Sequence, residues 1–281
     1  MTILADVSDT ALWVAVYRAR ESERPDALFS DPLARRLSGE RGRQIAANMS
    51  GACYTEWTVV MRTYIIDAYV RELVAQGIDT VINLGAGLDT RPYRMNLPAT
   101  LRWIEVDYPH VIQLKEDRLA AETPTCRLER VALDLADRDA RNALLSKCNA
   151  ESRKALVLTE GVMPYLTLEQ GAALARDLRR CPNFQFWIVE YFSARVMPYL
   201  RRRGRMKEMR QAPFQFFPED WFGFFRAHGW GAKATRYLGE TSFALRRPIP
   251  MPWWVKVLRA LLRPTDRSVL QMSGYSVLVP V

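Results

Sequence analysis

The stretch VINLGAGLDTR, residues 81–91, decides the fold of this chain. A short, mainly apolar run enters a Gly-Ala-Gly turn, which is the pattern of a buried strand that turns sharply and opens a helix. Gly85 and Gly87 allow a tight backbone turn and place no side chain in the path of a ligand. The stretch therefore predicts the ligand-binding turn of a nucleotide-binding α/β unit.

A second predicted strand ends in an acid at an informative distance from this turn. The segment WIEVD, residues 103–107, places Asp107 22 positions after Gly85. In nucleotide-binding α/β units, the acid that binds the ribose hydroxyls follows the glycine turn by about 20 residues. Asp107 is therefore predicted to accept hydrogen bonds from a ribose.

The turn departs from the dinucleotide-binding pattern G-x-G-x-x-G. The third glycine is replaced by Thr90, and an acid, Asp89, precedes it. A pyrophosphate favours helix N-terminal N–H groups without a carboxylate nearby. Asp89 therefore indicates a ligand with a cationic end, and S-adenosyl-L-methionine, with its ammonium and sulfonium groups, fits better than NAD. A nicotinamide-dependent oxidoreductase is the weaker alternative.

Strands and helices alternate between residues 79 and 191, which predicts a parallel sheet with crossover helices. The expected strands span 79–84, 101–106, 127–133, 155–160 and 184–191, and the expected helices span 109–122, 137–148 and 168–180. Thr167 and Gln170 form a predicted capping box for the last of these helices. Strand-like segments at 232–246 and 273–280 predict a terminal hairpin that completes a seven-stranded, mostly parallel sheet.

Polar and glycine residues recur at the ends of successive predicted strands. The first four strands end at Gly85 and Gly87, at Asp107, at Asp134 and at Glu160. Ligands of open α/β sheets bind at the carboxyl ends of the strands. One such acid would mean little, but groups at four ends in register predict a single binding site.

The rest of the chain is expected to belong to the same domain. The predicted parts of this single domain, 1–281, are N-terminal helices at 1–78, the α/β core at 79–192, a helical cap at 193–230 and C-terminal strands at 231–281. The stretch 57–76 reads as an amphipathic helix that places Arg62 beside the first strand. The cap is expected to carry a basic run at 201–207 and an aromatic core at 213–230, which would line an apolar acceptor pocket.

Composition narrows the classes of partner. The formal charge of +9 and the pI of about 9.6 raise nucleic acid as a partner. The basic run RRRGRMK at 201–207 reads more simply as a solvated helix face, and the chain lacks the signatures of the RRM, KH and zinc-finger folds. A nucleic-acid-binding protein or nucleic-acid methyltransferase is therefore an alternative, and no nucleic-acid partner is expected.

Cysteine usage and hydropathy bound the cellular setting. The four cysteines are far apart and never form C-x₂₋₄-C, so neither a metal site nor a disulfide framework is predicted, and a reduced cytoplasmic setting is expected. No apolar run approaches 18 residues, so no membrane span is expected. The segment 252–259 suits core packing or a homodimer contact better than docking on a membrane, and a homodimer stays open.

Together these residues resemble the leucine carboxyl methyltransferase family, including its bacterial branch of S-adenosyl-L-methionine-dependent O-methyltransferases associated with polyketide and other secondary metabolism. The resemblance rests on NLGAGLDTR at 83–91, EVDYP at 105–109, DL at 134–135 and EGVMPYL at 160–166. It covers most of the chain, and the first of these strings is far more specific than a bare G-x-G. It implies a class I methyltransferase, Rossmann-like fold with a helical cap.

The resemblance also implies how the cofactor is bound. Gly85 would face the methionine portion of S-adenosyl-L-methionine, and Arg62 would pair with its carboxylate. Asp107 would hold the ribose hydroxyls, Asp134 would accept from the adenine amino group, and Leu135 would pack near the ring. A basic residue of the N-terminal region, Arg18 or Arg20, would lie near the carboxylate, and the sequence does not choose between them.

The methyl acceptor is the least defined part of the prediction. Glu160 would lie beside the sulfonium and the acceptor pocket. An anionic carboxylate acceptor needs no base, whereas a phenol with a pKa near 10 benefits from one. Because His110 and His228 are expected to have structural roles, the scarcity of bases favours a small, acidic, partly apolar acceptor that is methylated on a carboxylate or acidic hydroxyl. A phenol deprotonated by Glu160 or Tyr165 stays open.

Overall fold

The structure, a computed structural model, describes residues 8–48, 52–196, 213–250 and 267–281. The basic run 201–207 and the segment 252–259 lie outside the described residues, as does most of the helix expected at 193–212. Within the part that is described, no helix is long and apolar enough to span a membrane.

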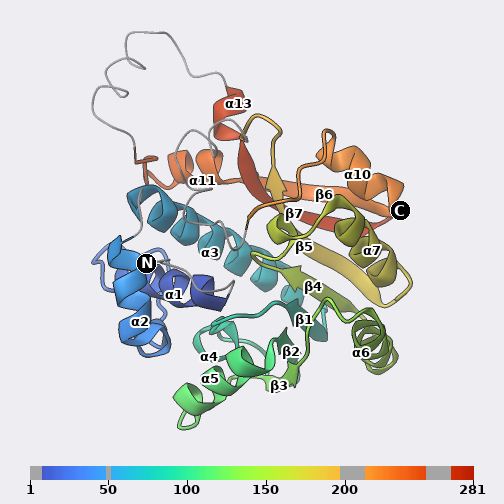
Figure 1. The fold of residues 1–281 in the computed structure, drawn as a ribbon, viewed down its shortest axis with the longest axis horizontal. Coiled ribbons are helices and arrows are strands. Elements are labelled where there is room, and N and C mark those ends of the chain that lie inside the picture. Colours follow the sequence, from blue (N-terminus) through green and yellow to red (C-terminus); the bar gives the residue numbers. More distant parts are fainter. Residues whose placement is uncertain (1–7, 49–51, 197–212, 251–266) are drawn as a thin grey trace.

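Seven strands form one sheet in the order β3-β2-β1-β4-β5-β7-β6 (Figure 1). The strands are β1 (Thr80–Leu84), β2 (Arg102–Asp107), β3 (Arg127–Ala132), β4 (Ala155–Thr159), β5 (Phe184–Phe192), β6 (Trp230–Tyr237) and β7 (Ser273–Pro280). β7 runs antiparallel to both of its neighbours, and the first five strands pair in parallel. The predicted seven-stranded, mostly parallel sheet is confirmed, and the five core strands begin and end within one residue of the predicted bounds.

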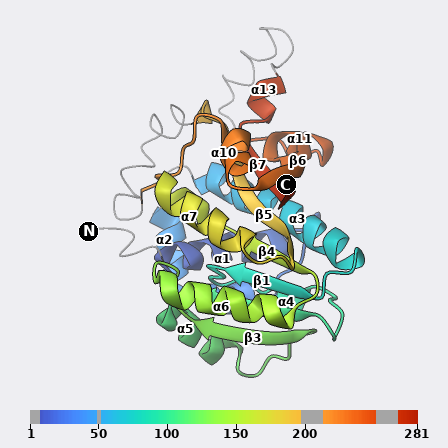
Figure 2. The same cartoon turned by 90° about the vertical axis from the view of Figure 1, so that its right-hand side faces the viewer.

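Helices cover both faces of this sheet (Figure 2). The helices are α1 (Ser8–Ser22), α2 (Ala34–Asn48), α3 (Ala52–Ala75), α4 (Arg91–Arg94), α5 (Pro109–Leu119), α6 (Arg138–Glu151), the 3₁₀ turn η1 (Met163–Tyr165), α7 (Leu168–Arg179), α10 (Trp221–Ala227), α11 (Leu238–Ala244) and α13 (Arg267–Leu270). Successive strand residues alternate between two cores: Val81 packs with α3, whereas Ile82 packs with α6, α7 and α10. The predicted capping box of Thr167 and Gln170 begins α7.

The predicted strand at 232–246 is wrong in its second half. β6 ends at Tyr237, and the chain then turns into α11. Leu238 is buried in the core on the α3 side, and the Cα of Gly239 approaches the backbone of Leu270 too closely for a side chain. β6 and β7 pair as expected, but a long segment with its own helices joins them, so they do not form a tight hairpin.

The helix α3 is not amphipathic, although the sequence at 57–76 suggested that it was. Met61 packs toward the sheet, whereas Val59 packs with Trp13 and Tyr17 of α1 on another side. The helix lies between the sheet and α1, so it is apolar on more than one side. This position holds Arg62 inside the molecule, next to the ends of the strands.

The aromatic segment 213–230 does not form the core of a separate cap. Phe216, Trp221, Phe225 and Trp230 are buried in the same core as the sheet residue Trp187. The ring centroids of Trp187 and Trp230 lie 5.5 Å apart in an edge-on arrangement. This segment therefore covers one face of the sheet. Among the described residues, α1 and the first half of α3 cover the strand ends, and Phe214 and Gln215 of this segment also lie there.

Candidate active site

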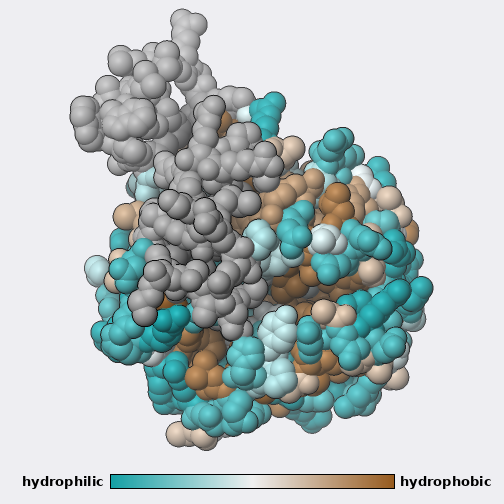
Figure 3. Space-filling model, in the orientation of Figure 1, coloured by the Kyte–Doolittle hydropathy of each residue, from teal (hydrophilic) through white to brown (hydrophobic). Residues whose placement is uncertain are grey.

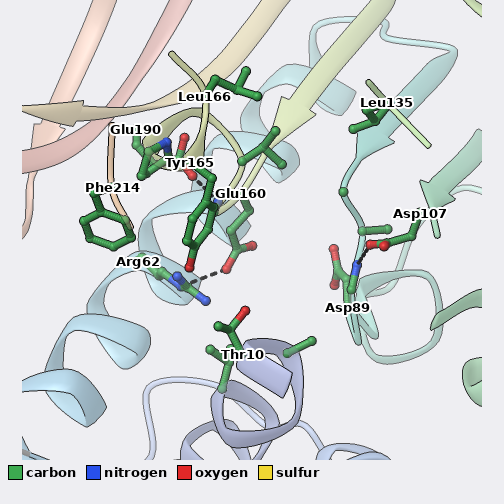
Figure 4. Close-up of a pocket in the computed structure, with 18 of the residues that line it drawn as sticks. Thr10, Arg62, Asp89, Asp107, Leu135, Glu160, Tyr165, Leu166, Glu190 and Phe214 are labelled. Carbon is green, nitrogen blue, oxygen red and sulfur yellow. Dashed lines mark hydrogen bonds and ion pairs between the residues drawn. The ribbon is translucent and has the colours of Figure 1, made fainter. Parts of the chain in front are cut away.

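A cavity of about 660 Å³ lies at the carboxyl ends of the strands, beneath α1 and α3. Every residue predicted to bind cofactor or to act in catalysis lines it: Arg62, Gly85, Asp107, Asp134, Leu135, Glu160 and Tyr165. In Figure 4, Asp107 and Leu135 lie on one side, Glu190 and Phe214 lie on the other, and Glu160 stands between them. The cavity thus brings together residues that are far apart in the sequence, from Arg62 to Tyr165.

The turn after β1 requires glycine for two physical reasons. Gly85 has a φ of +70°, a conformation that L side chains rarely adopt. A Cβ at this position would also lie 2.4 Å from Cγ2 of Val162, which follows β4. The sequence suggested only that glycine leaves room for a ligand. The structure shows that the two strand-end loops also pack against each other here.

Asp107 is fixed by the backbone of the glycine turn. Its Oδ2 accepts a hydrogen bond from Gly87 N at 2.6 Å, and its Oδ1 accepts one from Tyr108 N at 2.8 Å. Burial raises the pKa of Asp107 against the opposing effect of these bonds. Each carboxylate oxygen retains acceptor capacity for a ligand hydroxyl.

The predicted adenine end of the cavity wall is partly open to solvent. Asp134 is exposed, and its Oδ1 accepts from Ala136 N at 2.9 Å, while Leu135 is half-buried beside it. The two arginines between which the sequence did not choose lie in different surroundings. Arg18 lines the cavity and is 5% exposed, whereas the side chain of Arg20 points outward and pairs with Glu56.

Asp89 does not present a free charge to a cationic ligand, contrary to the sequence-based expectation. Its Oδ2 accepts hydrogen bonds from Asn83 Nδ2 and Arg91 Nη1, each at 2.8 Å, and its Oδ1 accepts from Arg91 N at 2.8 Å. Burial would raise its pKa, but Arg91 and the other nearby cations together outweigh burial and lower the pKa. The carboxylate is therefore an internal counter-ion of the turn.

Arg91 organises the polar centre, and the sequence analysis missed this role. Its side chain is 1% exposed and pairs with Asp67 at 2.7 Å, Asp89 at 2.8 Å and Glu160 at 2.7 Å. Only the fold brings Asp67 of α3 and Glu160, which directly follows β4, to this guanidinium. The signal in the sequence was an arginine directly after the buried turn, where a solvated side chain is not expected.

Glu160 is held by two arginines at the middle of the cavity. Its Oε1 lies 3.0 Å from Arg62 Nε, and its Oε2 lies 2.7 Å from Arg91 Nη1. Burial would raise the pKa of Glu160, but Arg91 and Arg62 outweigh it and lower the pKa below its ordinary value. Glu160 is therefore an anion at neutral pH and a weak proton acceptor.

Tyr165 lies on the far side of Glu160 from Asp107. Its ring packs edge-on against Phe214 with centroids 5.3 Å apart, and its hydroxyl bonds to Thr10 of α1. Burial raises the pKa of Tyr165 to about 12. The phenol stays protonated at neutral pH, so it can donate a hydrogen bond but not accept the acceptor's proton.

Glu190, near the carboxyl end of β5, is a second feature that the sequence analysis missed. It lines the cavity, is 3% exposed, and accepts a hydrogen bond from Gly161 N through Oε1. Its Oε2 is buried and has no hydrogen-bond partner among the described residues. Burial raises the pKa of Glu190 to about 7. The signal available in the sequence was an acid within the apolar strand FWIVEYF, in register with the other strand ends.

Other candidate groups are absent from the described cavity wall. Neither His110 nor His228 lines the cavity. The described residues also contain no cluster of three or more His, Cys, Asp or Glu residues that is arranged to hold a metal. Carboxylic acids, phenols and arginines are therefore the titratable side chains of the described cavity wall.

Comparison with known proteins identifies a matching family and several relatives. Residues 11–179 match the leucine carboxyl methyltransferase family. A protein of Frankia alni, provisionally named an S-adenosyl-L-methionine-dependent methyltransferase, is 30% identical over 88% of this chain and 91% of its own length. A protein of Parafrankia with the same provisional name is 32% identical over 88% of this chain and 83% of its own.

Solved structures share the fold at low sequence identity. A duf574 family protein from Streptomyces avermitilis superposes with a TM-score of 0.54 and 15% identity over 95% of this chain and 97% of its own. A provisionally named methyltransferase from Thermobifida fusca gives a TM-score of 0.56 and 16% identity over 94% of each chain. The strand order, the matched family and these relatives agree. The chain belongs to the leucine carboxyl methyltransferase family of S-adenosyl-L-methionine-dependent methyltransferases.

Proposed function

We propose that this protein transfers the methyl group of S-adenosyl-L-methionine to an oxygen atom of a small-molecule acceptor. The observation that carries the proposal is the order of groups along the strand ends. Following the sheet from β3 to β5, the cavity wall presents Asp134, Asp107, Gly85, Glu160 and then Glu190. This order suits a nucleoside followed by an amino acid, and Glu190 would then lie beyond them, next to an acceptor.

The side chains of the cavity wall suit S-adenosyl-L-methionine. The fixed carboxylate of Asp107 would accept from the ribose hydroxyls, and Asp134 with Leu135 would contact the adenine. Gly85 leaves room for the methionine portion, and Arg62, whose side chain is 18% exposed at the cavity, would meet its carboxylate. The cavity volume of about 660 Å³ lies within the ordinary range for a ligand of this kind plus a small acceptor.

When bound, S-adenosyl-L-methionine supplies an electrophilic methyl group, so the protein mainly has to align the acceptor oxygen with it. The end of the cavity beyond Glu160 suits an apolar acceptor. Trp13, Tyr54, Val59 and Phe214 line it, and these side chains would exclude water from the reacting oxygen. The acceptor is therefore proposed to be small and partly apolar, with one acidic oxygen.

Calorimetry followed by product analysis tests this proposal. The purified protein should bind S-adenosyl-L-methionine and S-adenosyl-L-homocysteine and should not bind NAD. Incubation with a library of phenols and carboxylic acids should then give a methylated oxygen detected by mass spectrometry. Binding of NAD alone, or methylation of RNA or DNA in place of small molecules, would contradict it.

A matched pair of glycine variants locates the binding site. Gly85 and Gly77 both have positive φ, but a Cβ at Gly77 meets nothing within 4 Å, whereas one at Gly85 collides with Val162. Backbone strain alone costs on the order of 1–3 kcal/mol at such positions. Gly77→Val should therefore lose some stability and keep cofactor affinity, whereas Gly85→Val should lose cofactor binding. Equal affinity in the two variants would place the site elsewhere.

A further inference from the structure

Glu190 differs from Glu160 because one of its two carboxyl oxygens has no hydrogen-bond partner among the described residues. Oε1 accepts from Gly161 N, which fixes the side chain, while Oε2 is buried and has no partner among the described residues. A buried oxygen without a hydrogen bond costs free energy and calls for an explanation. A ligand group that occupies the cavity would provide the missing partner.

The position of Glu190 indicates which ligand group this is. β5 lies beside β4 on the side away from β1 and β2, so Glu190 is one strand farther from Asp107 than Glu160 is. In Figure 4, Glu190 lies with Tyr165 and Phe214, on the opposite side of Glu160 from Asp107. If the ribose binds at Asp107, then Glu190 faces the acceptor and not the nucleoside.

We propose that Glu190 is the general base of the reaction and that the acceptor is a hydroxyl compound of the phenol or enol class. This inference rests on the proposed methyl transfer to oxygen and specifies it. The acceptor hydroxyl would donate its hydrogen bond to Oε2 of Glu190, which is the oxygen that lacks a partner.

At this end of the cavity, no other described group can take this proton as readily. Both oxygens of Glu160 pair with arginines, so protonating it would break two ion pairs. Tyr165 is a phenol with a raised pKa, and neither histidine lines the cavity. The sequence favoured a carboxylate or acidic hydroxyl because it offered few candidate bases. Glu190 is a candidate base that the sequence analysis did not count, so an ordinary phenol is also a suitable acceptor.

The surroundings of Glu190 set its proton affinity. The charged and titratable groups that face it are Arg62 from α3, Glu160 directly after β4, Tyr165 from η1 and Tyr275 from β7. Burial raises the pKa of Glu190 to about 7, while Arg62 opposes and Glu160 adds to the rise. A base whose pKa lies near the working pH is half ionised there and still binds a proton well, which is the best compromise for general base catalysis.

The step is balanced without a further reactant. A bond forms between the acceptor oxygen and the methyl carbon as the bond from that carbon to the sulfonium sulfur breaks, and the sulfur keeps that electron pair as a neutral thioether. The hydroxyl proton passes to Oε2 of Glu190, whose carboxylate becomes a carboxylic acid. Release of this proton to water then restores the base.

Two matched glutamate variants test the proposal without turnover. Glu190→Gln keeps the size of the side chain and an oxygen for Gly161 N, but it cannot take a proton. Glu129→Gln, on the outer strand β3, serves as the control. The probe is 4-nitrophenol, whose phenolate absorbs visible light, bound to the complex with S-adenosyl-L-homocysteine. In the wild type and the control, the phenolate signal should follow two coupled titrations, because the bound probe and Glu190 share a proton; in Glu190→Gln it should follow a single titration.

Kinetics with substituted phenols give a second measurement. Loss of a general base costs roughly 10²–10⁴-fold in rate. For phenol itself, kcat of Glu190→Gln should fall by about that factor, while the Kd for S-adenosyl-L-homocysteine changes less than twofold. The loss should shrink as the phenols become more acidic, because an acceptor that is already ionised needs no base.

Several outcomes would overturn this assignment. A loss that is uniform across the phenol series would make Glu190 a positioning residue, and failure of every phenol to bind would exclude the acceptor class. Methylation of a carboxylic acid at equal rates by wild type and Glu190→Gln would refute the base but leave methyl transfer to oxygen intact. Failure of the wild type to bind S-adenosyl-L-homocysteine would instead refute the proposed function itself.

Discussion

Glu160 and Glu190 lie at the ends of adjacent strands, and both are buried in the same cavity, yet their charges are controlled in opposite ways. Two arginines hold Glu160, so its pKa falls. Glu190 accepts a hydrogen bond from Gly161 N and has no direct ion pair, and burial raises its pKa to about 7. The difference teaches that burial does not decide the protonation of an acid in this site. Whether a guanidinium pairs directly with the carboxylate decides it.

This comparison divides the cavity into two regions with different duties. On the side of β1 and β4, the charges are fixed by partners: Arg91 binds Asp67, Asp89 and Glu160. Fixed charges suit a cofactor whose own charge does not change until the methyl group leaves. On the side of β5, an acid without a cationic partner can change its charge during a reaction.

The largest loss of stability is expected from removing Arg91, which pairs with three acids. Arg91→Met would leave Asp67, Asp89 and Glu160 without their shared cation, and removing one partner of a buried ion pair costs about 3–5 kcal/mol. Arg153→Met is the matched control, because its side chain is 93% exposed and pairs only with Asp79 at the surface; exposed pairs are worth about 0–1 kcal/mol. Urea unfolding measures both. Equal losses would show that Arg91 does not hold the site together.

The opposite pKa shifts of the two glutamates give opposite dependences of stability on pH. The pKa of Glu160 is lowered on folding, so its contribution is present above the unfolded value of about 4.5 and is lost as the pH falls through the folded pKa. Glu160→Gln should therefore cost stability at pH 7 and progressively less in acid.

The pKa of Glu190 is raised, so its contribution is present below about 4.5 and is lost as the pH rises to about 7. At about 1.4 kcal/mol per unit, the stability of wild type relative to Glu190→Gln should fall by up to about 3 kcal/mol across this window. Thermal unfolding of wild type and both variants between pH 4 and pH 8 checks the signs. Parallel curves for the two variants would contradict the comparison.

Asp107 is a third case beside the two glutamates, because backbone N–H groups, and not arginines, hold its carboxylate. Asp107→Ala should weaken binding of S-adenosyl-L-methionine by about 1.5–3 kcal/mol through the loss of charge-assisted bonds to the ribose. Asp107→Asn should lose less, since its amide oxygen can still accept from Gly87 N. Calorimetry at fixed pH gives the two affinities. Unchanged binding in the alanine variant would remove Asp107 from the cofactor site.

The smallest effect is expected at Arg62, and it concerns the affinity for the cofactor. Arg62 pairs with Glu160 through Nε and is proposed to meet the cofactor carboxylate as well. Arg62→Lys keeps the positive charge but loses the planar fork that can serve both partners. Affinity for S-adenosyl-L-methionine should fall by about tenfold or less, which is about 1.4 kcal/mol. A lysine variant with wild-type affinity would limit the role of Arg62 to Glu160.

Features that depend on local sequence were predictable. The glycine turn at residues 85–87 and the acids Asp107, Asp134 and Glu160 follow from strands of regular length that end in register. All of them line the cavity. The core strands could be placed because parallel strands buried on both faces are nearly continuous apolar runs between helical patterns.

Features that depend on long-range packing were not predictable. The carboxylate of Asp89 was expected to face a ligand, because the sequence does not show that Arg91 folds back onto it. Glu190 was passed over because a single sequence does not reveal that an acid within an apolar strand lacks a cation. α11 was missed because its first residues have no side-chain cap, and tertiary contacts of Leu238 determine where β6 ends.

The position of β7 has a consequence for the order in which the chain can assemble. β7 comes last in the sequence, but it lies between β5 and β6 and carries Tyr275, which lines the cavity. When a growing chain has emerged through β5, every strand of the cofactor region is already present. The wall around the acceptor stays incomplete, and the edge of β5 stays unpaired, until residues 273–280 form β7 between β5 and β6. Because pairing across such sequence distances is slow, a newborn chain is expected to gain the ability to bind its cofactor before it can enclose an acceptor.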